Sequence, residues 1–325
     1  MKTKAPIFGI LIFCLINLNV TAQDKPIDQQ TIVYTIIYNA VPDNFGYPLI
    51  GFINLAQGNH KGLQVGFVNT TIKNFEGLQV GFVNTTLQNS RGAKVGFVNT
   101  TRQDAEGLRL GYINTTLGSY KGATIGFVNT TMENTEGLQL GFVNIAKKEL
   151  NGAQIGFINV ADSIPNGVPI GFLSFVEKGG YRAVEVSVNE LYPLNLAFKI
   201  GVPRFYSYLQ GSYNNSYSKQ FALGFGFGSL ISMGNKFYFN PELGNLSPLT
   251  SIDNNVTNLV ANIRYNISSR FQVATGLSAV WINHQQGKNL YDPPFYSIIN
   301  HEINNRNRIL MGARIALSYS FTELY

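Results

Sequence analysis

A fifteen-residue repeat of constant length constrains this chain more than any other feature. Each copy carries a Gly-Phe or Gly-Tyr pair, and a second glycine lies four residues ahead of most pairs, as in the segment from Gly62 to Thr71. The pairs begin at Gly51, Gly66, Gly81, Gly96, Gly111, Gly126, Gly141, Gly156 and Gly171. One unit copied many times is typical of a scaffold, a wall or a surface array, and it argues against a single chemical site.

The side chains within each copy alternate between an apolar face and a polar face. Leu63, Val65 and Phe67 lie on the apolar face. The opposite face carries a polar column formed by Gln64, Gln79, Lys94, Arg109, Gln139 and Gln154. A period of two with β-branched and aromatic residues predicts a β-strand, and the spacers between copies are rich in turn-forming Asn, Asp, Ser and Gly.

The first arrangement compatible with this pattern is an antiparallel meander, in which each copy supplies one strand of an outer-membrane β-barrel. A strand of about ten residues is long enough to cross a bilayer at a tilt. The apolar face would contact lipid, and the polar column would line a lumen. With the strands of the second half, the chain would supply about 16 to 18 strands, enough for a barrel of porin size.

The alternative is a parallel β-solenoid followed by a smaller barrel. Each copy would form one coil, and a recurring asparagine would form a hydrogen-bonded ladder inside the stack, through Asn54, Asn69, Asn84, Asn99, Asn114, Asn129, Asn144 and Asn159. The absence of insertions favours the solenoid, because hairpin loops usually vary in length. A coil with one apolar and one solvated face leaves little core, however, and we therefore expect the meander.

The second half of the chain predicts barrel strands without the repeat. Alternating apolar segments lie at 183–189, 195–202, 204–212, 220–231, 236–243, 257–267, 271–282 and 308–321, and the polar stretch 283–307 is expected to be a long loop. The last segment alternates apolar residues from Ala313 to Phe321, and the chain ends at Tyr325. This resembles the closing strand that outer-membrane assembly machinery recognises, so we expect that machinery and outer-membrane lipid as partners.

The N-terminus predicts export. Lys2 and Lys4 precede an apolar run from Ile7 to Ile16, and small residues end at Ala22, which is typical of a cleaved signal peptide. The only cysteine, Cys14, lies inside this peptide, which excludes disulfides from the mature chain. The expected division is a signal peptide at 1–22, an N-terminal segment and first strand at 23–46, the repeat region at 47–178 and barrel strands at 179–325.

The Gly-Leu-Gln-x-Gly-Phe-x-Asn copies resemble those of bacterial surface repeat-containing proteins, most of which are hypothetical proteins of Gram-negative bacteria. The resemblance covers about residues 47–176. It implies a location in the cell envelope, and it carries no activity and no functional residue to transfer.

No group of residues predicts catalysis, a metal site or a cofactor. The three histidines, His60, His284 and His301, are far apart and lie in expected turns or loops. The chain lacks a Lys/Arg cluster, so a nucleic-acid partner is not expected. We therefore expect a non-enzymatic outer-membrane protein, either a passive channel for small solutes or a structural envelope component. The alternative is a surface-exposed solenoid that acts as an adhesin or binds a ligand.

Overall fold

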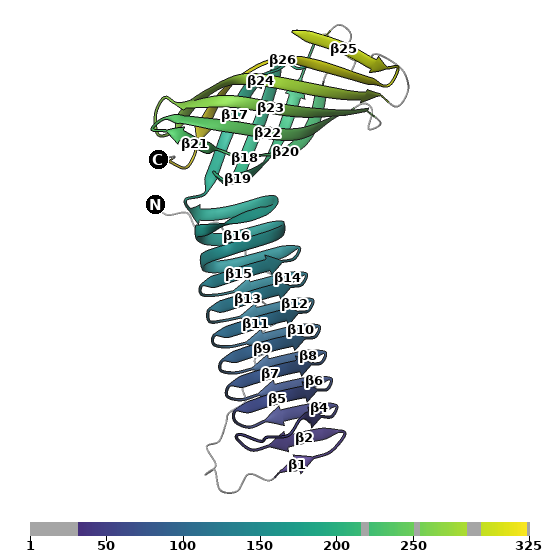
Figure 1. The fold of residues 1–325 in the computed structure, drawn as a ribbon, viewed down its shortest axis with the longest axis vertical. Coiled ribbons are helices and arrows are strands. Elements are labelled where there is room, and N and C mark those ends of the chain that lie inside the picture. The colour runs from purple at the N-terminus through teal and green to yellow at the C-terminus, as the bar shows by residue number, and fades with distance from the viewer. Residues whose placement is uncertain (1–31, 216–220, 250–253, 285–293, 324–325) are drawn as a thin grey trace.

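The computed structural model describes residues 32–215, 221–249, 254–284 and 294–323, and its regular structure is entirely β. The strands form two bodies, a solenoid (residues 33–178) and a barrel (residues 181–320) (Figure 1). Among the described residues there is no helix with the length and apolar character needed to span a membrane. The predicted signal peptide at 1–22 lies outside the described residues.

The solenoid consists of two stacks of parallel strands, and each full coil contributes one strand to each stack. Equivalent positions pair between neighbouring coils, so that Asn69 pairs with Asn84. One stack contains β3 (Leu49–Ile50), β5 (His60–Val65), β7 (Phe75–Val80), β9 (Ser90–Val95), β11 (Ala105–Leu110), β13 (Tyr120–Ile125) and β15 (Thr135–Leu140). The other contains β2 (Tyr38–Val41), β4 (Ile53–Ala56), β6 (Val68–Thr71), β8 (Val83–Thr86), β10 (Val98–Thr101), β12 (Ile113–Thr116) and β14 (Val128–Thr131). The long strand β16 (Val143–Lys178) pairs with both stacks, and β1 (Val33–Tyr34) pairs antiparallel with β2 at the far end.

This architecture confirms the all-β class and the alternative of a solenoid followed by a smaller barrel. The antiparallel meander expected for residues 47–178 is not formed, and the repeats supply no strands to a porin-sized barrel. The expectation assumed that a solenoid needs an apolar core. Instead, most of the inward-facing side chains of the coils are polar and bond to one another, which satisfies most of these buried groups without a wholly apolar core.

The polarity of the coils is the reverse of that in a water-soluble β-protein, because polar side chains point inward and apolar side chains point outward. Gln64, Asn69 and Thr71 point inward and are fully buried, whereas Phe67 on the outside is 46% exposed. The Gly-Phe turn between the two strands of a coil packs tightly on the coil before it. A Cβ atom on Gly66 would lie 2.1 Å from the carbonyl oxygen of Gly51 in the preceding coil. This close approach explains why glycine recurs at that position in every copy.

The barrel is a closed sheet of eight antiparallel strands, in which the first strand pairs with the last. Its strands are β17 (Tyr181–Val188), β18 (Leu194–Val202), β19 (Phe205–Tyr213), β20 (Phe221–Gly228), β22 (Phe237–Pro248), β23 (Asn254–Asn266), β24 (Phe271–His284) and β26 (Asn307–Ser320). Each corresponds to one predicted segment. Two short strands extend the sheet, β21 (Ile231–Gly234) beside β22 and β25 (Ile299–Asn304) beside β26. The strand β25 lies within the stretch predicted as a loop.

The solenoid joins the side wall of the barrel (Figure 1). Ser207 in β19 donates a hydrogen bond of 2.6 Å to the carbonyl oxygen of Phe172 in β16. The ring of Phe172 contacts that of Phe225 in β20, with centroids 6.3 Å apart. Strand alternation points Ile200 and Val202 of β18 outward, yet both are buried. The last coil therefore covers part of the barrel's outer surface.

Candidate functional site

The polar column predicted to line a lumen lies inside the solenoid. Its members Gln64, Gln79, Lys94, Arg109, Gln139 and Gln154 are all buried between the two stacks. Gln79 donates to Gln64 over 2.6 Å, and Gln154 donates to Gln139 over 2.8 Å. These side chains bond to neighbouring coils, so the column contributes to the core of the stack and does not form a surface for solutes.

Lys94 and Arg109 occupy the same column in adjacent coils. The Lys94 ammonium donates to the hydroxyls of Thr86 and Thr101, at 2.8 and 3.1 Å, and to the carbonyl of Thr100 at 2.9 Å. Arg109 donates to Thr101 and Thr116 and lies over the ring of Tyr120, 4.9 Å from its centroid. Burial, and to a lesser extent the nearby guanidinium, hold the pKa of Lys94 well below its usual value of 10.5. Burial also lowers the pKa of Arg109, to about 10.

Replacing Lys94 with glutamine, the residue found at this position in four other coils, is expected to raise the free energy of unfolding of the solenoid at neutral pH, because the folded chain no longer buries an ammonium group. The unfolded chain binds a proton at Lys94 up to pH 10.5, whereas the folded chain releases it at lower pH. The free energy of unfolding of the wild type therefore rises with pH between the pKa of Lys94 in the folded chain and its pKa in the unfolded chain. Over the same pH range the difference in stability between Lys94→Gln and the wild type becomes smaller.

The test compares the urea unfolding of the wild type and Lys94→Gln across pH, followed by far-UV circular dichroism. Lys121→Gln is the matched control, because the Lys121 side chain is 62% exposed. A constant difference between wild type and Lys94→Gln at every pH would contradict the buried-charge explanation.

The asparagine column is structural, as the solenoid alternative expected. Each side-chain amide donates to the carboxamide oxygen of the next coil, over distances of 2.7 to 3.0 Å from Asn39 to Asn159. The second amide hydrogen is also used: Asn69, for example, donates 2.9 Å to the carbonyl of Val80, next to the Gly-Phe turn of the following coil. The ladder thus fastens each tight turn to the coil before it.

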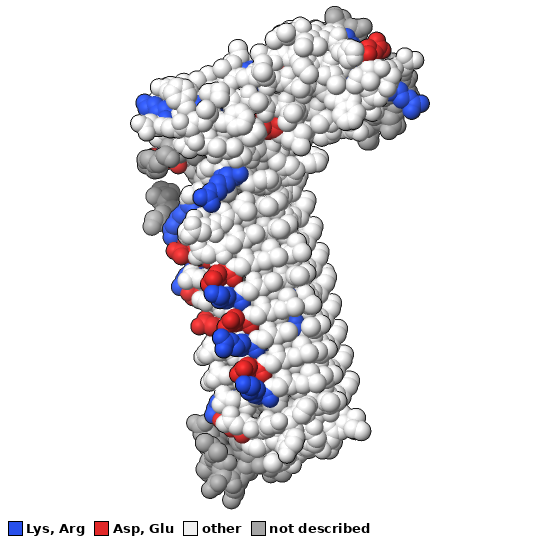
Figure 2. Space-filling model, in the orientation of Figure 1, with Lys and Arg blue, Asp and Glu red and all other residues white. Residues whose placement is uncertain are grey.

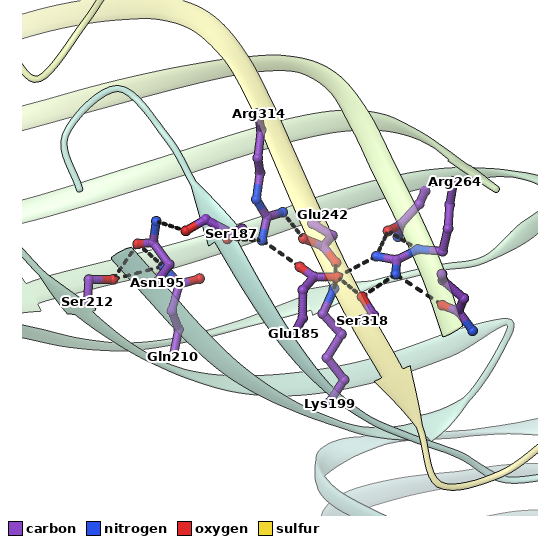
Figure 3. A network of polar contacts seen from close by, with 12 residues as sticks. Glu185, Ser187, Asn195, Lys199, Gln210, Ser212, Glu242, Arg264, Arg314 and Ser318 are labelled. Atoms are coloured by element: carbon purple, nitrogen blue, oxygen red, sulfur yellow. Dashed lines mark hydrogen bonds and ion pairs between the residues drawn. The ribbon is translucent and has the colours of Figure 1, made fainter. Parts of the chain in front are cut away.

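The barrel encloses a cluster of five charged side chains that the sequence analysis did not identify (Figure 3). Glu185 accepts from Lys199, Arg264 and Arg314 at 2.7, 2.6 and 2.7 Å. Glu242 pairs with Arg314 at 2.5 Å and also with Lys199. We call these five residues the ion cluster. Each is a charged residue at an inward-facing position of an alternating strand, and this pattern was the available sequence signal.

Apolar layers lie on both sides of the ion cluster. Tyr181, Tyr206 and Tyr238 belong to a buried group near the end of the barrel that has short turns. Val256, Ile282 and Leu310 belong to a second group near the end with long connections. The interior of the barrel is therefore filled along its length, as expected for about eight strands.

A groove with a volume of about 910 Å³ runs along one edge of the solenoid. It follows a column in which the charge alternates from coil to coil, giving the ion pairs Lys61–Glu76, Arg91–Glu106 and Lys121–Glu136 at 3.1, 3.1 and 2.8 Å. We call this side the charged edge, and Figure 2 shows its lysines, arginines and acids gathered along the solenoid. Exposed pairs of this kind contribute little stability.

The histidines do not converge. His60 is buried at the start of β5 and stacks on Phe75, so its expected place in a solvated turn was wrong. His301 is exposed in β25, and the side chain of His284 lies outside the described part of the structure. Among the described residues, no three His, Cys, Asp or Glu side chains are placed to hold a metal ion.

Comparisons with known proteins give no relative. No family model, no curated protein and no solved structure matches this chain.

Proposed function

We propose that this protein is a non-enzymatic structural component of a Gram-negative outer membrane, in which the barrel crosses the bilayer and anchors the solenoid. The observation that carries the proposal is the reversed polarity of the barrel, which has apolar side chains on its outside and charged side chains on its inside. Leu196, Leu259 and Leu277 on the outside are 54%, 56% and 69% exposed, whereas the ion cluster inside is buried. Apolar-out and polar-in alternation is the pattern of transmembrane β-barrels.

The filled interior favours an anchor over a passive channel. Buried ion pairs and two apolar layers occupy the space through which a solute would pass. The final strand β26 closes the barrel, which supports a role for the outer-membrane assembly machinery in its insertion.

The proposal is tested with the full-length mature protein and phosphatidylcholine vesicles that contain a small fluorescent dye. We expect the protein to float with the vesicles in a density gradient and the dye to be retained. Co-flotation with rapid dye release would favour the channel, and failure to float would overturn the membrane location.

The groove at the charged edge supports a second candidate function, binding of an extended polar ligand at the surface. Its lining repeats every coil and alternates in charge, so it fits a polymer with a regular repeat better than a compact molecule. Retardation of the protein on an immobilised polysaccharide or peptide array, lost on mutation of Arg91 and Glu106, would favour this role.

A further inference from the structure

Five columns of outward-facing side chains on the solenoid contain no charged residue. In the second coil they are represented by Leu63, Val65, Phe67, Val68 and Thr70, and their equivalents up to Phe175 are only Leu, Ala, Val, Ile, Phe, Tyr or Thr. The aromatic members are 42% to 46% exposed from Phe67 to Phe157. Apolar surface that recurs in every coil is unusual for a water-exposed protein, and such surface marks contact with a membrane or with another protein.

The apolar columns continue into the outer wall of the barrel. The rings from Phe52 to Phe172 stack with centroids 4.9 to 5.1 Å apart. The last of them, Phe172, contacts Phe225 on the barrel wall. Phe225 is flanked there by Leu209, which is 46% exposed. The two bodies therefore share one continuous apolar surface.

The solenoid covers the outer surface of the barrel only in the half that lies toward the short turns. The outward residues that it buries, Ile200, Val202 and Ser207, lie next to the short turn between β18 and β19. Leu194 and Leu196, toward the long connections, remain about half exposed. The charged edge lies on the same side of the molecule as the short turns of the barrel (Figures 1 and 2).

We propose that the solenoid lies in the plane of the membrane, embedded in the leaflet at the short-turn end of the barrel without spanning the bilayer. The aromatic column points toward the bilayer centre, the Leu, Val and Thr columns contact acyl chains, and the charged edge lies among the headgroups. This inference rests on the proposed outer-membrane location of the barrel.

The dimensions of a coil agree with this placement. A six-residue strand such as β5 is about 20 Å long. One leaflet with its headgroups is also about 20 Å thick, half of a bilayer of 40–45 Å. Within the stack, backbone groups of the strands bond to the neighbouring coils and the asparagine amides bond to one another, which is how polar groups are tolerated in hydrocarbon.

The test measures the depth of nitroxide labels in the full-length protein reconstituted into phosphatidylcholine vesicles. Residues 23–325 contain no cysteine, so single variants of this part of the chain can be labelled at chosen positions. Phe97→Cys reports on the aromatic column, and Val128→Cys reports on a neighbouring column if the first variant does not fold. Glu106→Cys is the matched control on the charged edge, and Leu277→Cys is the reference on the barrel wall.

Collisions with oxygen, which concentrates in hydrocarbon, are compared with collisions with a water-soluble nickel chelate. We expect the oxygen-to-nickel ratio at Phe97 or Val128 to match that at Leu277 and to exceed that at Glu106 several-fold. A low ratio at Phe97 and Val128 with a high ratio at Leu277 would place the solenoid in water and overturn this inference alone. A low ratio at Leu277 as well would overturn the proposed function too. Protection of both solenoid labels from both reagents would mean that protein covers the columns, which also contradicts the inference.

Discussion

Replacing Glu185 with glutamine is expected to lower the free energy of unfolding of the barrel by about 3–5 kcal/mol, the usual cost of removing one partner from a buried ion pair. The Glu185 carboxylate accepts from Lys199, Arg264 and Arg314, and its exposed fraction is zero. Glutamine keeps the volume but removes the charge, which leaves three buried cations facing Glu242 alone. Urea unfolding followed by the fluorescence of Trp281, the only tryptophan, measures the loss.

Lys199→Met is the matched control for Glu185→Gln. It removes one cation from the ion cluster and leaves two arginines facing two carboxylates, so we expect a smaller loss of stability. If Glu185→Gln cost no more than Lys199→Met, the charge balance of the ion cluster would not be what stabilises the interior.

Replacing Asn99 with leucine is expected to lower the free energy of unfolding of the solenoid by about 3 kcal/mol or more. The Asn99 amide donates to Asn114 and to the carbonyl of Leu110, at 2.8 and 2.9 Å, and its oxygen accepts from Asn84 at 2.9 Å. Leucine cannot make any of these bonds. Three buried groups then lose a partner, and each such loss costs about 1–3 kcal/mol. Urea unfolding followed by far-UV circular dichroism measures the effect.

The control for Asn99→Leu is a second asparagine ladder on the charged edge. Asn89 donates 3.1 Å to Asn74 in the same coil-to-coil fashion but is exposed to solvent. Asn89→Leu is expected to change stability by no more than about 0.5 kcal/mol, because water replaces the lost bond. Equal effects of the two variants would show that burial of the inner ladder is not decisive.

The sequence predicted the strands of the barrel better than the arrangement of the repeats. Each alternating segment from Ala183 to Phe321 forms a barrel strand, because inward and outward residues differ in polarity along it. In the repeats, the same alternation fits a lipid-facing hairpin and a coil with a polar interior equally well. The constant spacing of Asn69 and its equivalents was the better indicator, since a ladder between coils requires one register throughout.

The ion cluster could not be predicted as a unit. Glu185 and Arg314 are 129 residues apart in the chain and meet only because the first strand of the barrel pairs with the last. Single charges in alternating strands mark inward positions, but the pairing between them depends on strand number and register. The residues of the polar column containing Lys94 share one face, but their expected place along a lumen was wrong, because parallel stacking turns that face into the interior of the coils.

The alternation of charge along the charged edge has a consequence for how such a chain can lengthen. Lys61, Arg91 and Lys121 occupy every second coil, with Glu76, Glu106 and Glu136 between them. Duplication of one coil would set like charges side by side, whereas duplication of two adjacent coils would preserve every pairing. A change in length of thirty residues therefore keeps the alternation intact, whereas a change of fifteen residues creates one contact between like charges.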